Sequence, residues 1–346
     1  MILPLSARLR HADRRGVPDA RGRGGTDGQL AAINAVLTDC VRRGQSIRNV
    51  MANNPDLFPF CERTMYNYVG LKVFDAVRGD LPFACSRRPR KSRPQTKTDA
   101  KCRVGRAQPD LLSYRLANPD TVGHEAEMDG LEGQKADGRY MFTYIFNDTG
   151  LALGVIRDGK TSADCRAVFD TLWEAAGPAL FRKIFRVIIT DNGPEFSDPG
   201  MIENWRPDPG HNPTKLLPRG VRVWFADPCC SSQKPHIERF HNELRRILQK
   251  GTSFDPLTQE QIALALSHLN SYPRESLGWR TPYDVFVERH GEEGRAFLAK
   301  LGIVRIPENQ VTLHPFLLGA KFQKAADRAI LRKNGVAPAQ KPELKK

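Results

Sequence analysis

Residues 124–157, HEAEMDGLEGQKADGRYMFTYIFNDTGLALGVIR, decide the fold class of this chain. They contain three runs, HEAEMDGL, RYMFTYIFN and LALGVIR, whose length and composition are typical of β-strands. Turn-forming residues separate these runs at 133–138 and at 147–150. Three successive strands joined by short turns predict an antiparallel meander.

The residues that follow extend this meander into a larger sheet. Apolar spacing predicts a helix from Ser162 to about Ala176, and a second amphipathic helix from about Gln233 to Leu248. Between them, an apolar strand covers 184–189 and a further strand begins at Arg222. This order predicts an α/β fold with a mixed five-stranded sheet and flanking helices, in which the first and fourth strands are neighbours.

The amino-terminal part predicts a small all-α domain over residues 26–80. Apolar residues at helical spacing end at Gly44, a short second pattern follows Ser46, and a third runs from Glu62 to about Val69. Three short helices with a tight turn before the last predict a helix-turn-helix, whose last helix enters the major groove of DNA. Its candidate DNA contacts are Arg63, Thr64 and Asn67. A generic helical bundle is the alternative.

The charge of the chain predicts a polyanionic partner. Lys and Arg number 53 against 39 Asp and Glu, which gives a net charge of +14. Residues 87–106 hold nine Lys or Arg and one Asp, so this segment favours contacts with DNA phosphates. A solvated linker is the alternative interpretation. The candidate contacts in this segment are Arg87, Arg88, Arg90, Lys91 and Arg93.

Composition also divides the chain and excludes some classes of protein. We predict a disordered Arg/Gly-rich tail over 1–25, a basic linker over 81–117, a catalytic core over 118–290, and a partly helical extension with a basic tail over 291–346. Apolar runs reach only strand length and the start is too short for a signal peptide, so we expect a cytoplasmic protein without a membrane partner.

Three carboxylates lie at positions of the predicted fold that could bring them together. Asp129 lies in the first strand, Asp191 directly follows the apolar fourth strand, and Glu238 lies on the second amphipathic helix. Converging carboxylates repel one another unless cations intervene. Two Mg²⁺ ions would resolve that repulsion and suit phosphodiester chemistry. Chance placement is the alternative, because the chain has 39 acidic residues.

Four ordered motifs resemble a known family: GHEAEMDGLEG at 123–133, ITDNGPEF at 189–196, SSQKPHIERFHNELRRILQKGTSF at 231–254 and LNSYPRESLGWRTPYDVF at 269–286. They resemble DDE-type insertion-sequence transposases with a retroviral-integrase-like core, most closely the insertion-sequence family numbered thirty. The resemblance implies a ribonuclease-H-like fold. It also implies that Asp129, Asp191 and Glu238 are the metal ligands, and that Asn242 and Arg245 contact DNA.

The resemblance implies a DNA transposase that cleaves and joins DNA with two Mg²⁺ ions, for which Mn²⁺ would substitute. Its partners would be double-stranded DNA, both element terminal repeats and target, and at least one further copy of the chain. Asp191 and Glu238 lie 47 positions apart, more than the family's usual interval, and the excess predicts a surface loop over 198–220. The alternatives are a decayed or co-opted DNA-binding protein and a ribonuclease-H-like nuclease.

Overall fold

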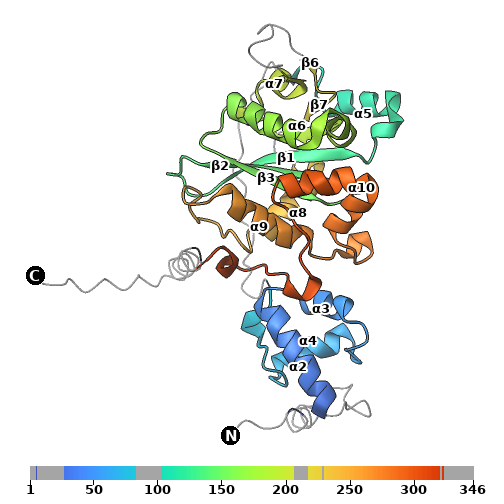
Figure 1. Ribbon diagram of the computed structural model, residues 1–346, viewed down its shortest axis with the longest axis vertical. Helices are drawn as coiled ribbons and strands as arrows, with labels where there is room; N and C mark the ends of the chain where they lie inside the picture. The colour runs from blue at the N-terminus through green and yellow to red at the C-terminus, as the bar shows by residue number, and fades with distance from the viewer. Residues whose placement is uncertain are drawn as a thin grey trace, which may run out of the picture.

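A computed structural model describes residues 27–82, 103–205, 217–227 and 230–319, together with Leu5 and Phe322. A cluster of short helices forms one end of the molecule, and a larger layered α/β body forms the other (Figure 1). The predicted tail over 1–25, apart from Leu5, and most of the basic segment lie outside the described residues.

A mixed five-stranded sheet forms the centre of the α/β body, in the order β3-β2-β1-β4-β7. The first three strands pair antiparallel, whereas β4 and β7 run parallel to β1. This order confirms the predicted ribonuclease-H-like fold and the predicted neighbourhood of the first and fourth strands. The strands are β1 (Glu125–Glu132), β2 (Tyr140–Phe146), β3 (Ala152–Arg157), β4 (Val187–Thr190) and β7 (Arg222–Phe225).

Helices cover both faces of the sheet, which is why all seven residues of β2 are buried. The helix α6 lies on one face, and α8 and α9 lie on the other (Figure 1). The bounds of the helices around the sheet are α5 (Gln108–Ala117), α6 (Ser162–Ile184), α8 (Pro235–Leu244), α9 (Gln259–Asn270) and α10 (Pro282–Lys300).

One predicted helix end was confirmed and the other was wrong. The first long helix was expected to stop near Ala176, and it does break there, at Gly177, where φ is +72°; a second helical segment then takes α6 to Ile184. Gly177 tolerates this positive φ because it has no side chain. Pro178 can begin the second helical segment because the first residue of a helix does not use its backbone N–H in a hydrogen bond within the helix. The second amphipathic helix is shorter than expected and ends at Leu244 rather than at Leu248.

The predicted surface loop over 198–220 contains regular structure. Helix α7 (Pro199–Glu203) precedes a two-stranded ribbon of β5 (Asn204–Trp205) and β6 (Leu217–Pro218). Arg219, whose side chain is fully buried, donates to the carbonyl of Ile202 at 3.0 Å and forms an ion pair with Asp170 of α6. The hydrogen bond joins the two ends of the insertion to each other, and the ion pair holds the end at Arg219 to α6.

The amino-terminal helices are α2 (Asp27–Arg42), α3 (Ile47–Asn53) and α4 (Glu62–Gly70), close to the predicted ranges. They enclose their own apolar core. The tight turn, however, lies between α2 and α3, and the longer segment 54–61 precedes α4. A prediction of the turn before the last helix was therefore wrong, because Pro55 and Pro59 extend that connection.

Two predicted domain boundaries also move. Helix α5 was assigned to the basic linker, yet its Leu111 and Tyr114 pack against Trp224 of β7. Helix α10 is kinked at Gly291, next to the boundary predicted at residue 290, but Phe297 and Leu298 beyond the kink still belong to the main apolar core. The α/β body therefore begins before residue 118 and continues beyond residue 290.

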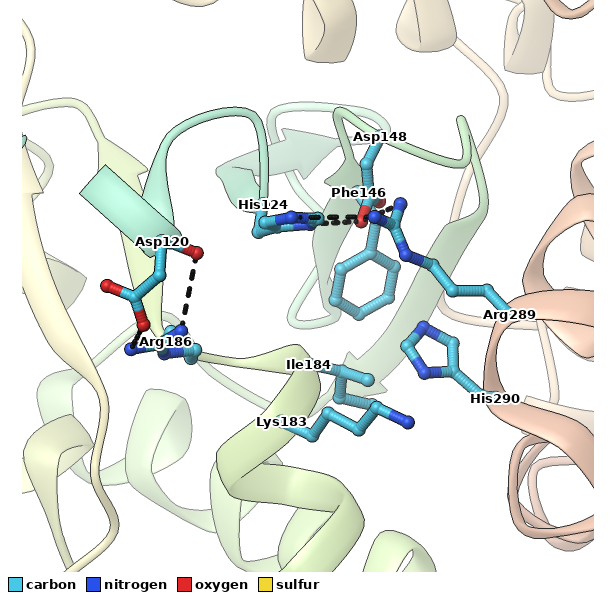
Figure 2. Close-up of a pocket in the computed structure, with 9 residues that line it drawn as sticks. All are labelled: Asp120, His124, Phe146, Asp148, Lys183, Ile184, Arg186, Arg289 and His290. Carbon is cyan, nitrogen blue, oxygen red and sulfur yellow. Dashed lines mark hydrogen bonds and ion pairs between the residues drawn. The ribbon is translucent and has the colours of Figure 1, made fainter. Parts of the chain in front are cut away.

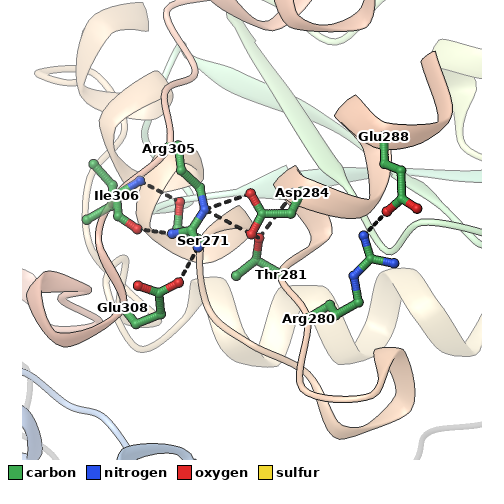
Figure 3. Close-up of polar contacts among 8 residues, drawn as sticks. All are labelled: Ser271, Arg280, Thr281, Asp284, Glu288, Arg305, Ile306 and Glu308. Carbon is green, nitrogen blue, oxygen red and sulfur yellow. Dashed lines mark hydrogen bonds and ion pairs between the residues drawn. The ribbon is translucent and has the colours of Figure 1, made fainter. Parts of the chain in front are cut away.

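The segment after α10 joins the α/β body to the amino-terminal helices. The Nε of Arg305 donates to both carboxylate oxygens of Asp284, at 2.9 and 3.0 Å, and the backbone of Ile306 donates to Ser271 (Figure 3). Farther along, Leu313 donates to the carbonyl of Arg43 at 2.7 Å. Gln45, which is fully buried, also donates from its side chain to the carbonyl of Val311. The amino-terminal helices are thus held against the core by this segment.

His268 makes this attachment sensitive to acid. Its Nδ1 accepts a hydrogen bond from the backbone of Thr312 at 2.9 Å, and burial lowers the pKa of His268 to about 4 from an ordinary 6.5. Because the folded pKa is depressed, its stabilisation is complete above pH 6.5 and is lost as pH falls toward 4. By this linkage, protonation costs about 2 kcal/mol at pH 5.

We expect His268→Asn to reduce this acid sensitivity, because the asparagine oxygen can accept the Thr312 hydrogen bond and does not titrate. The fall in unfolding free energy between pH 7 and pH 5 should be about 2 kcal/mol smaller in the variant. Urea titrations monitored by circular dichroism at both pH values measure it. Parallel pH dependences in the two proteins would contradict the expectation.

Candidate metal centre

Asp129 and Asp191 lie side by side on neighbouring strands. The parallel register of β1 and β4 pairs Glu127 with Ile189, so its continuation by two residues brings Asp129 opposite Asp191. Neighbouring strands are about 4.8 Å apart. The backbone N–H groups of Gly130 and Gly193 donate to Asp129 and Asp191 at 2.8 and 3.1 Å. The two carboxylates thus share one edge of the sheet, at the carboxyl end of β4.

A buried lysine compensates the charge of this pair. The Nζ atom of Lys234 lies 3.3 Å from Oδ2 of Asp129, and the lysine side chain is 8% exposed. Burial raises the pKa of Asp191 and the nearby Asp129 raises it further, while the positive charge of Lys234 opposes both effects. The two neighbouring carboxylates of Asp129 and Asp191 are therefore stabilised by a positive charge beside them.

Glu195 is a further buried carboxyl group whose charge interacts with that of Asp191, and sequence reasoning did not single it out. It is buried in the short turn after Asp191, and the hydroxyl of Tyr140 donates to its Oε1. Burial raises the pKa of Glu195, and the charge of Asp191 contributes to that rise. The motif ITDNGPEF contains Glu195, but its spacing alone did not distinguish a buried side chain from a solvated one.

Helix α8, which carries Glu238, is anchored at its first turn by Glu127. This carboxylate is almost fully buried and accepts from the backbone of Ile237 at 2.8 Å and from His236 Nδ1 at 2.7 Å. A carboxylate at a helix amino terminus is favourable because the unpaired N–H groups there carry partial positive charge. Glu127 raises the pKa of His236 by accepting this hydrogen bond.

A second contact fixes α8 over the strands. The hydroxyl of Thr143 donates to the carbonyl of Asp129 at 2.9 Å and lies 2.8 Å from Nε2 of His241. Burial lowers the pKa of His241 to about 4, so the ring is neutral at pH 7. Since the single hydroxyl proton is committed to Asp129, His241 must be protonated on Nε2 and donate to Thr143. Through Thr143, His241 therefore connects α8 to the backbone carbonyl of Asp129.

Glu238 lies on the exposed side of α8, and its carboxylate has no hydrogen-bond or ion-pair partner among the described residues. No set of three or more Cys, His, Asp and Glu side chains in the described segments is close enough to hold a metal ion. The structure thus brings Asp129 and Asp191 together, but not Glu238. Two carboxylates still fit Mg²⁺, which is commonly held by one or two carboxylates with water and substrate phosphate as its other ligands.

The other predicted contacts fall into four groups. Arg63, Asn67 and Asn242 are exposed. Thr64, in contrast, is only 4% exposed and is buried within the helical domain, so its side chain does not reach the surface where DNA would bind. Arg245 is half-buried and donates to the carbonyl of Glu132 at 2.9 Å, so it also ties α8 to β1. Five predicted phosphate contacts lie outside the described residues: Arg87, Arg88, Arg90, Lys91 and Arg93.

A cavity of about 180 Å³ lies at the opposite end of the strands, near His124 and Arg186 (Figure 2). Its acidic side chains already have cationic partners. Asp148 accepts from Arg289 at 2.7 Å, and Asp120 pairs with Arg186 at 2.7 Å. This arrangement is typical of internal ion pairs, and it separates the cavity from the carboxylates of Asp129 and Asp191.

Comparison of the sequence with known proteins finds similarity to insertion-sequence transposases. The sequence is 36% identical over 255 residues to the transposase for insertion sequence element IS1086 of Cupriavidus metallidurans, covering 70% of this chain and 66% of that protein. The chain is similar to insertion-sequence transposases. It spans just under two thirds of that relative's length. No protein-family model matches the sequence.

Two further similarities are more limited. The transposase InsI for IS30A of Escherichia coli K12 is 33% identical over 70 residues, which cover 20% of this chain and 18% of that protein. Among solved structures, the catalytic core domain of BIV integrase shows 19% identity and a TM-score of 0.33, covering 49% of this chain and 98% of that domain. None of the described helices is long and apolar enough to cross a membrane.

Proposed function

We propose that the chain is a metal-dependent DNA transposase of the DDE type, related to the insertion-sequence family numbered thirty. The observation that carries the proposal is the Asp129–Asp191 pair on adjacent parallel strands, with a buried ammonium 3.3 Å from Asp129. The similarity to insertion-sequence transposases supports the same reaction class. Asp129 and Asp191 would hold Mg²⁺, or Mn²⁺ in its place, and Glu238 would complete the ligand set.

When bound there, a pair of divalent cations would activate the attacking oxygen and stabilise the leaving oxygen of a phosphodiester. The protein's own contribution is positional. Glu127 and His241 hold α8, the helix that carries Glu238, against strands β1 and β2. The hydrogen bonds from Gly130 and Gly193 orient the aspartate oxygens. Such fixed geometry lowers the reorganisation needed in the transition state.

We further propose that the amino-terminal helices bind the terminal repeats as a helix-turn-helix, and that two element ends are brought together by at least a dimer. The exposed Arg63 and Asn67 on α4 support this role. The basic segment over 87–106 would follow the DNA backbone.

The proposal is tested with purified protein and DNA carrying the flanks of its own coding region. Nicking and strand joining are scored in Mg²⁺, in Mn²⁺ and with a chelator. We expect metal-dependent cleavage at the element ends followed by joining to target DNA. Specific binding without cleavage would instead indicate a decayed or co-opted DNA-binding protein, and cleavage of RNA–DNA hybrids without joining would indicate a nuclease.

A change at Arg63 tests the DNA-binding role of α4. We expect Arg63→Ala to weaken binding to the element ends by about tenfold, and a lost phosphate contact would reduce the slope of log affinity against log salt by about one. Fluorescence anisotropy at several salt concentrations measures both quantities. Arg42→Ala is the matched control, because Arg42 is an exposed arginine of the same domain located on α2. Equal losses in the two variants would mean that α4 has no special role.

A further inference from the structure

Lys234 is buried where a cation would bind. It precedes the first turn of α8, its side chain is 8% exposed, and Nζ lies 3.3 Å from Oδ2 of Asp129. Within the described segments, Nζ is shielded from solvent and has no hydrogen-bond acceptor in good geometry. A buried ammonium without hydrogen bonds is costly, so the negative charge beside it must account for its position.

The charge of Lys234 acts on both aspartates. It pairs directly with Asp129, and it also opposes the burial that raises the pKa of Asp191. Two carboxylates on adjacent strands would otherwise repel each other at the edge of the sheet. A single positive charge therefore stabilises the pair, in the place where the proposed function requires a divalent cation.

We propose that the Lys234 ammonium is a stand-in cation that holds Asp129 and Asp191 together and leaves when a divalent cation binds between them. This inference rests on the proposed function, because it requires that the two aspartates be metal ligands. A divalent cation would repel the ammonium and satisfy the carboxylates better. Lys234 lies outside the helical turns of α8, with φ −132° and ψ 58°, so its movement need not unwind the helix.

The first test follows Lys234 in the wild-type protein. An amine-reactive acylating reagent modifies accessible lysines, and mass spectrometry gives the extent of modification at each position. We expect little modification of Lys234 without metal. When Mg²⁺ is added, its modification should increase at least about fivefold, because the displaced side chain becomes exposed to solvent. Lys250, which is already exposed, is the internal reference and should not change. Metal binding that leaves Lys234 as protected as before would overturn the inference.

The second test measures competition. We expect Lys234→Met to bind Mn²⁺ at least about tenfold more tightly than the wild type, because a unit charge that competes with the metal is gone. Calorimetry or the electron paramagnetic resonance of free Mn²⁺ measures this affinity. The matched control is Arg239→Met, which removes the same charge from an arginine of α8 whose side chain is 58% exposed. Equal affinities in the two variants would overturn the inference.

A third variant separates this inference from the proposed function. Asp191→Asn should abolish most Mn²⁺ binding if Asp191 is a ligand. If Asp191→Asn binds Mn²⁺ as tightly as the wild type does, Asp191 is not a metal ligand. The metal site of the proposed function is then wrong, and so is the proposed role of Lys234. If binding depends on Asp191 but Lys234 neither becomes accessible nor competes, the metal site stands and the stand-in role alone is wrong.

Discussion

Replacing Asp191 by Asn should reduce metal-dependent DNA cleavage by at least about a thousandfold, equivalent to about 4 kcal/mol of transition-state stabilisation. The substitution keeps the size of the side chain and the oxygen that accepts from Gly193 at 3.1 Å. It removes the negative charge that would hold a divalent cation beside Asp129. Because Asp191 is half-buried and its carboxylate is disfavoured by burial, the neutral variant should fold at least as stably as the wild type.

The measurement is single-turnover cleavage of an element-end substrate in Mn²⁺, with the melting temperature recorded for each protein. Asp198→Asn is the matched control, since Asp198 is an exposed aspartate of the same connection, seven residues later in the chain. It should retain the wild-type rate. A rate for Asp191→Asn within about tenfold of wild type would show that catalysis does not depend on this carboxylate.

The sheet and the aspartate pair could be predicted because both depend on local patterns. Strand-forming runs separated by turns gave the meander, and an aspartate directly after an apolar parallel strand must lie at the edge of the sheet. The register then brings Asp129 opposite Asp191. These features follow from the alternation of side chains along a strand and from the order of the strands, and both can be inferred from the spacing of residues in the sequence.

The remainder of the site depends on packing between distant elements. Lys234 and Asp129 are 105 positions apart, and nothing in the residues near either one specifies that they meet. Thr64 appeared suitable for a DNA contact by its type, but the way α4 packs turns it inward. One missed signal was present in β1, where Glu125, Glu127 and Asp129 alternate and therefore share a face of a buried strand.

Glu127 is the middle residue of that alternation, and replacing it should cause the largest loss of cleavage after Asp191→Asn. We expect Glu127→Ala to lower the unfolding free energy by about 3 kcal/mol, since it removes two charge-assisted hydrogen bonds and leaves a buried N–H of Ile237 unpaired. Cleavage should fall by about a hundredfold while the protein remains folded, because α8, which carries the proposed metal ligand Glu238, is then held less precisely. Urea denaturation and single-turnover cleavage measure the two effects.

Glu127→Gln distinguishes a positioning role from general destabilisation. The glutamine oxygen can still accept from Ile237, but its neutral side chain no longer raises the pKa of His236, which should return toward 6.5 in NMR titrations. A raised folded pKa stabilises the protein fully below pH 6.5, and this stabilisation is lost as pH rises through the folded value. The stability difference between wild type and Glu127→Gln should therefore be largest in mild acid and shrink toward alkaline pH. A difference that grew with pH would mean that the His236–Glu127 contact does not anchor α8.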